Sequence, residues 1–135
     1  MPARPFHLTP TNPPEIDRQA EIARYLLREP RVKFFIRVNG GGRFIKGAFV
    51  WFYKLFVPGF EPAHGKGVSD LIGQLRDGRF FAIEIKKPGA RTDKSREALQ
   101  AAFLTLVAQA GGAAGIAENW QDAKKIICGD SACQD

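Results

Sequence analysis

Apolar residues recur at helical spacing in two long segments of the chain. The first is predicted to be a helix that begins at Pro14 or Glu15 and ends near Arg28, before Pro30. Its apolar stripe consists of Ile16, Ala20, Ala23 and Leu27, widened by Ile22 and Leu26.

The second helical segment has the most regular pattern in the sequence. Its apolar positions are Leu99, Ala102, Phe103, Leu106, Val107 and Ala110. Thr92 or Asp93 can cap its start, and the pair 111–112, two glycines, ends it. A last short helix is predicted from Asn119, as N-cap, to about Ile127.

Shorter apolar runs between these helices predict strands. Val32–Asn39 alternates loosely, residues 44–56 are dense in aromatic side chains, and Ala113–Ala117 is a short apolar run. The last run follows the strand that ends near Lys86 through a helix, so these two strands should be parallel. The elements predict an α/β fold with a small central mixed β-sheet flanked by α-helices. We expect one domain over residues 15–127, between a flexible Pro-rich arm (1–14) and a frayed tail (128–135).

Charged residues interrupt the apolar pattern on the two strands around residues 76–78. Phe80, Ala82, Glu84 and Lys86 share one strand face by alternation, and residues 81, 83 and 85 share the other. A two-residue turn would turn Asp70 away from Glu84. A three-residue loop closed by Gly78 in the left-handed conformation would place Asp70 directly opposite Glu84, and this is the loop we predict.

Two acids and a lysine on one strand face point to metal chemistry, because an unpaired buried charge is costly. Asp70 and Glu84 could hold a divalent cation, and Lys86 could position a water beside it. The alternative is that Asp70 is a turn residue while Glu84 and Lys86 form an ion pair on a solvated strand.

These residues belong to an ordered series of blocks that resembles a known nuclease family. The blocks are residues 66–73 (KGVSDLIG), 78–89 (GRFFAIEIKKPG), Gln100 and 111–117 (GGAAGIA). They resemble the VRR-NUC branch of the PD-(D/E)XK nucleases, which is common as stand-alone proteins in phages and bacteria. The resemblance covers roughly residues 15–127 and implies a restriction-endonuclease-like core.

The resemblance also implies roles for individual residues. Asp70, Glu84 and the backbone carbonyl of Ile85 would hold Mg²⁺ or Mn²⁺, and Lys86 would hold the attacking water. Gln100 would join the site; the alternative is a plain surface glutamine. An acid of the first helix would complete the site, with Glu15 favoured and Asp17 second.

The charge balance suits a nucleic-acid partner. The net charge is +6, with 20 basic and 14 acidic residues. The basic residues we expect to contact DNA around the site are Lys66, Lys87, Arg91, Lys94 and Arg43, and the alternative is that they are ordinary solvated surface charges. The family resemblance adds Asn39 to this set. No base-reading motif is evident, so we expect recognition of DNA shape rather than sequence.

The aromatic stretch 49–56 (FVWFYKLF) is expected mainly to pack in the core. It has apolar residues on both strand faces, so one face is a candidate homodimer contact, and a base-stacking surface is a less favoured alternative.

Other classes of protein fit less well. No apolar run reaches the roughly 18 residues of a membrane span, and no signal peptide is evident, so we expect a cytoplasmic protein with no membrane contact. Cys128 and Cys133 have no nearby histidines and are expected to be incidental thiols.

The sequence thus predicts a metal-dependent DNA endonuclease, selective for branched substrates such as four-way (Holliday) junctions. The alternative is a non-catalytic DNA-binding or assembly protein on a nuclease-derived fold.

Overall fold

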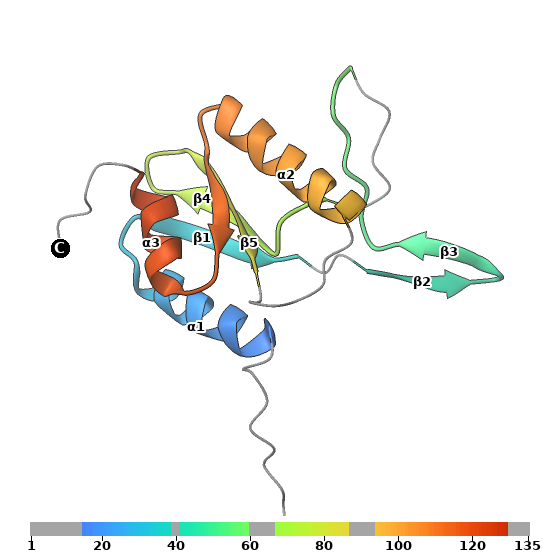
Figure 1. Ribbon diagram of the computed structural model, residues 1–135, viewed down its shortest axis with the longest axis horizontal. Helices are drawn as coiled ribbons and strands as arrows, with labels where there is room; N and C mark the ends of the chain where they lie inside the picture. The colour runs from blue at the N-terminus through green and yellow to red at the C-terminus, as the bar shows by residue number, and fades with distance from the viewer. Residues whose placement is uncertain (1–14, 39–40, 60–66, 87–93, 130–135) are drawn as a thin grey trace, which may run out of the picture.

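The protein has a mixed α/β architecture, seen in a computed structural model (Figure 1) that describes residues 15–38, 41–59, 67–86 and 94–129. The described elements are α1 (Glu15–Arg28), β1 (Val32–Arg37), β2 (Gly42–Ile45), β3 (Ala48–Trp51), β4 (Leu71–Leu75), β5 (Phe80–Ile85), α2 (Lys94–Gln109), β6 (Ala113–Ala117) and α3 (Trp120–Cys128). Four strands form one mixed sheet in the order β1-β4-β5-β6. The β1–β4 and β4–β5 pairs are antiparallel, and β5–β6 is parallel, as predicted.

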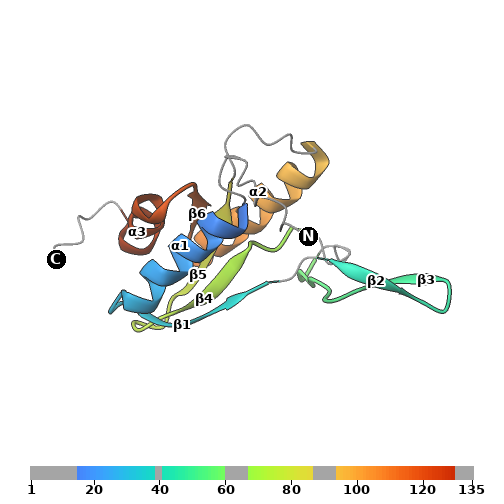
Figure 2. The ribbon, with the colours of Figure 1, turned by 90° about the horizontal axis from the view of Figure 1, so that it is seen from below.

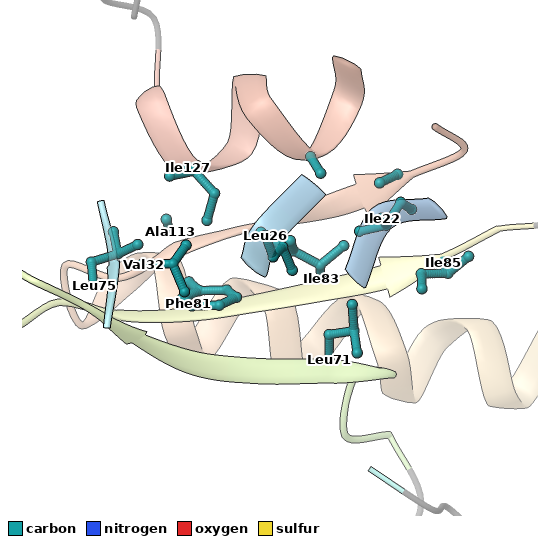
Figure 3. Close-up of a cluster of buried hydrophobic side chains, with 12 residues drawn as sticks. Ile22, Leu26, Val32, Leu71, Leu75, Phe81, Ile83, Ile85, Ala113 and Ile127 are labelled. Carbon is teal, nitrogen blue, oxygen red and sulfur yellow. The ribbon is translucent and has the colours of Figure 1, made fainter. Parts of the chain in front are cut away.

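Helices cover both faces of this sheet. Figure 3 shows the larger core, in which Ile22 and Leu26 of α1 and Ile127 of α3 pack onto Phe81 and Ile83 of β5. All five side chains are at most 1% exposed. The opposite face carries α2, whose Phe103, Leu104 and Val107 pack on Ala82. The alternation predicted for β5 is therefore correct, because its odd-numbered residues face α1 and its even-numbered residues face α2.

The loop between β4 and β5 is the predicted three-residue loop. Leu75 N–H donates to Arg79 O at 2.8 Å, and Gly78 N–H donates to Leu75 O at 3.0 Å. Gly78 has φ = 96°, in the left-handed region that a residue with a Cβ enters only with strain. The loop sets a register in which Leu71 pairs with Ile83.

The buried stripes of both long helices match the predicted ones in part. On α1 the core residues are Ile22 and Leu26, whereas Leu27 is 75% exposed. On α2 the buried face runs through Phe103, Leu104 and Val107, and Leu99 and Leu106 are more than one-third exposed. In both helices apolar residues occupy two adjacent flanks, and the sheet selects the flank that fits it. In α2 the buried face is therefore rotated relative to the predicted stripe. Gln100 lies on the sheet-facing side of the helix and not at the edge of the stripe.

The prediction that the aromatic stretch packs in the core is wrong for much of it. β2 and β3 form a separate two-stranded sheet that projects away from the main body (Figure 2). Phe49, Phe52 and Phe56 are 43%, 52% and 71% exposed, while Leu55 returns to pack against the α2 core. No other described element packs closely enough on this hairpin to cover these side chains.

The C-terminal helix begins at the predicted residue, but the prediction for its cysteine is wrong. Asn119 is its N-cap, and its side chain accepts a hydrogen bond from Asp122 N–H at 2.8 Å. Cys128 ends α3 and is disulfide-bonded rather than a free thiol; the chain's other cysteine, Cys133, lies outside the described residues.

Among the described helices, none is long and apolar enough to cross a membrane.

Candidate functional site

Asp70 and Glu84 lie opposite each other where β4 and β5 separate. Continuing the register from the Leu71–Ile83 pair by one residue places Asp70 across from Glu84. Residues directly opposite in an antiparallel pair share a face, so both carboxylates are on the α2 side of the sheet. This is the arrangement that the three-residue loop predicts.

The Asp70 carboxylate closes the end of the β4–β5 ladder. Its Oδ2 accepts a hydrogen bond of 2.8 Å from Ile85 N–H, where a backbone carbonyl of a continuing strand would otherwise bind. Its own carbonyl accepts from Val38 N–H at 2.8 Å, which ties it to the residue after β1. The backbone of Asp70 is therefore bonded to the residue after β1, and its side chain is fixed by a charge-assisted hydrogen bond from β5.

The segment before Asp70 runs tightly along α2. Gly67 is buried with φ = 97°, and a Cβ there would lie 3.0 Å from Leu99 O. Only glycine combines this conformation with so close an approach to a helix backbone. The glycine of the GVSD segment thus positions the chain that delivers Asp70.

Glu84 is a buried carboxylate, 8% exposed, with an amide donor from α2. Gln100 Nε2 donates to Glu84 Oε1 at 2.6 Å. The structure therefore places Gln100 beside Glu84, and its role in a site stays a prediction. A buried carboxylate requires such donors, since its desolvation is costly.

Lys86 directly follows β5, two residues beyond Glu84 in the same alternation. Its Nζ is 3.4 Å from Glu97 Oε1, and the two side chains are 43% and 38% exposed. Glu97 was not predicted; its spacing of three residues from Gln100, which puts both on one helix face, is the signal that could have identified it. The cluster formed by Asp70, Glu84, Lys86, Glu97 and Gln100 is called the carboxylate cluster below.

Arg18 braces the same end of the sheet from α1. Its Nη1 donates to Lys86 O at 3.2 Å and to Glu118 O at 3.4 Å, joining the ends of β5 and β6. Nothing in the local sequence pattern distinguishes Arg18 from the other arginines of α1.

The remaining predicted residues divide into two groups. Lys94, the first residue of α2, and Arg43, in β2, are exposed. Asn39, Lys66, Lys87 and Arg91 lie outside the described residues, as does the side chain of Glu15. The competing acids of α1, Asp17 and Glu21, line a separate hollow with Glu118 and Asn119.

Asp70 and Glu84 are the residues of the carboxylate cluster that could hold a hard divalent cation, with two carboxylates as protein ligands. Within residues 15–38, 41–59, 67–86 and 94–129, no group of three His, Cys, Asp or Glu side chains is arranged to hold a metal. Mg²⁺ commonly binds through one or two carboxylates and keeps several waters, and Asp70 and Glu84 supply that number on one face.

Comparisons with protein-family models, with curated proteins and with solved structures each found no match to this chain.

Proposed function

We propose that the protein is a divalent-metal-dependent DNA endonuclease with a restriction-endonuclease-like core. The observation that carries the proposal is the placement of Asp70, Glu84 and Lys86 on one sheet face at the point where two strands part. The VRR-NUC-like order of the motifs, which includes these residues, and the basic charge of the chain also support the proposal. The proposed substrate is branched DNA, four-way junctions included.

In this proposal Asp70 and Glu84 hold Mg²⁺ or Mn²⁺, with the Ile85 carbonyl as a third ligand. The metal supplies a lowered pKa for a bound water and neutralises charge on the phosphate. Lys86 would orient the attacking water toward the scissile phosphate, and the ion pair with Glu97 would position the Lys86 ammonium. Gln100 fixes the Glu84 carboxylate, as donors to metal ligands commonly do.

A homodimer is part of the same proposal. Two copies would present two carboxylate clusters to one branched substrate and so allow paired cuts. Sedimentation velocity of the full chain tests this directly: a single species of about 15 kDa at micromolar concentration contradicts it.

A non-catalytic DNA-binding protein is the second candidate. The Lys86–Glu97 ion pair favours it, because it engages the lysine that would otherwise serve the water. The two candidates share DNA binding and differ in phosphodiester hydrolysis.

Cleavage of labelled DNA separates them. Four-way junction, flap, duplex and single strand are each incubated with Mg²⁺, with Mn²⁺ and with EDTA. Cleavage in metal that Glu84→Ala abolishes and Glu118→Ala retains supports the nuclease, since Glu118 is an exposed acid outside the cluster. Calorimetric titration with Ca²⁺ gives a second readout: binding by the parent and not by Glu84→Ala is expected. DNA binding without cutting in either metal would establish the second candidate instead.

A further inference from the structure

The net charge of the protein is concentrated in one segment. Residues 30–60 contain six of the 20 basic residues and none of the 14 acidic ones, so the rest of the chain has 14 of each. The segment therefore carries the whole net charge of +6. It comprises β1 and the projecting β2–β3 hairpin.

The hairpin presents aromatic rings on one of its faces. Phe44 pairs with Phe49, and Gly42 pairs with Trp51, so the three aromatic side chains share a face. Their rings contact edge to face, with centroids 5.2 Å apart for Phe44–Phe49 and 4.8 Å for Phe49–Trp51. Phe44 is nevertheless 74% exposed. Arg43 lies on the other face, across from Val50.

The tip of the hairpin carries a lysine in an unfavourable backbone conformation. Lys46 and Gly47 form a two-residue loop with φ = 50° and 81°, a type I′ arrangement in which Asn-Gly is preferred. A side chain in the left-handed region costs on the order of 1 kcal/mol. Lys46 is the one residue other than glycine with positive φ in the described part of the chain. Strained residues cluster at functional sites, so a strained, exposed lysine at a projecting tip points to a function of the tip.

The hairpin starts beside the carboxylate cluster. Val38, four residues before β2 begins, donates its N–H to Asp70 O at 2.8 Å. Figures 1 and 2 both show β2 and β3 projecting from the side of the molecule where α2 begins, and Glu97 and Gln100 are on that part of α2. A substrate seated at the cluster would lie within reach of the arm.

We infer that the β2–β3 hairpin is a DNA-binding arm for substrates with unpaired bases next to duplex. Arg43 and Lys46 contact phosphates, and the face of Phe44 and Phe49 stacks on exposed bases. Contact with DNA neutralises the like charges of the segment, whereas pairing two copies through their hairpins would bring those charges together. The inference rests on the proposed DNA function and specifies its substrate class.

The test measures binding apart from cleavage. Fluorescence anisotropy in EDTA compares duplex, overhang and four-way junction DNA over a salt series, using full-length protein. The test variant is Arg43→Ala with Lys46→Gly, in which glycine suits the turn and keeps the hairpin folded. The matched control is Arg28→Ala with Lys125→Ala, two exposed basic residues outside the segment. A third variant, Phe44→Ala, tests stacking.

We expect Arg43→Ala/Lys46→Gly to weaken binding at least about tenfold and to lower the salt slope by about 2, while the control binds like the parent. Phe44→Ala should remove the preference for overhang DNA over duplex, because only the overhang offers unpaired bases for stacking. Equal affinities of test and control variants would overturn the inference, as would parent protein that binds no DNA at low salt. Hairpin variants that dissociate a dimer yet keep DNA affinity would assign the hairpin to a subunit interface instead. Cleavage is not part of this readout. If the hairpin binds DNA but the protein cuts none, the nuclease proposal is overturned and the inference about the hairpin stands.

Discussion

Gln100 donates a hydrogen bond of 2.6 Å to the Glu84 carboxylate, and so joins the first half of α2 to the end of β5. The same helix face carries Glu97 toward Lys86 one turn earlier and Phe103 into the core one turn later. Packing of Phe103 on Ala82 therefore determines where the polar side chains of α2 meet the strand.

Removing the Gln100 amide should weaken both the site and the fold. We expect Gln100→Ala to lower Ca²⁺ affinity and metal-dependent cleavage about 10-fold, because Glu84 is then less firmly oriented. The free energy of unfolding should fall by about 1.5–3 kcal/mol, the scale of a hydrogen bond to a charged group. Gln109→Ala, an exposed glutamine of the same helix, is the control. Parent-like Ca²⁺ binding by Gln100→Ala would show that the amide does not serve the metal site.

Lys86 should matter for cleavage and little for stability. Lys86→Ala is expected to slow metal-dependent cleavage at least about 100-fold, the usual scale for loss of a group that activates water. Glu97→Gln should change the rate less, because it leaves the lysine in place. Both variants should unfold within about 1 kcal/mol of the parent, since the pair is more than one-third exposed. Chemical denaturation beside the cleavage assay measures both quantities. A Lys86→Ala protein that cuts at the parent rate refutes the assigned role.

The β4–β5 loop should depend on the backbone freedom of Gly78. A Cβ at Gly78 meets no atom within 4 Å, so Gly78→Ala costs conformational strain alone. We expect a loss of about 1–2 kcal/mol in the free energy of unfolding. Gln74→Ala, exposed on β4, should change it by less than about 0.5 kcal/mol. If Gly78→Ala were as stable as the parent, the left-handed residue would not be what determines the loop.

Glu29 gives the fold a defined response to acid. Burial at the end of α1 raises the pKa of this carboxyl. Hydrogen bonds from the Tyr25 hydroxyl at 2.7 Å and from Arg31 outweigh that effect and leave the pKa below its ordinary 4.5. A lowered folded pKa stabilises the protein above the unfolded pKa, and this stabilisation is lost as the pH falls through the folded value.

Glu29→Gln should therefore unfold more easily than the parent at pH 7. The difference should shrink as the pH falls below about 4.5. Urea denaturation of both proteins between pH 7 and pH 3 measures it, with Glu118→Gln as the exposed control. A difference that stays constant over that range would mean that the Glu29 charge contributes nothing.

The sequence alone determined the parts of the site that depend on local geometry. Alternation along residues 80–86 separates Glu84 and Lys86 from the buried odd-numbered residues, because a strand repeats every two residues. Gly78 predicts the loop length, and the loop length places Asp70 opposite Glu84. Asn119 identifies the start of α3 because N-cap chemistry is local as well.

Only the tertiary structure decided which flank of each helix faces the sheet and what covers each apolar surface. Leu26 and Leu27 are equally apolar, and only packing buries the first and exposes the second. The Arg18–Lys86 contact joins residues 68 positions apart on separate elements, so no local pattern encodes it. The spacing of Glu97 and Gln100 indicates a shared helix face, and only packing brings that face to Lys86. The aromatic residues of the hairpin have the composition of a core, and they are exposed because no described element packs over them. Burial is a property of the neighbours that a side chain acquires, which its own sequence context does not specify.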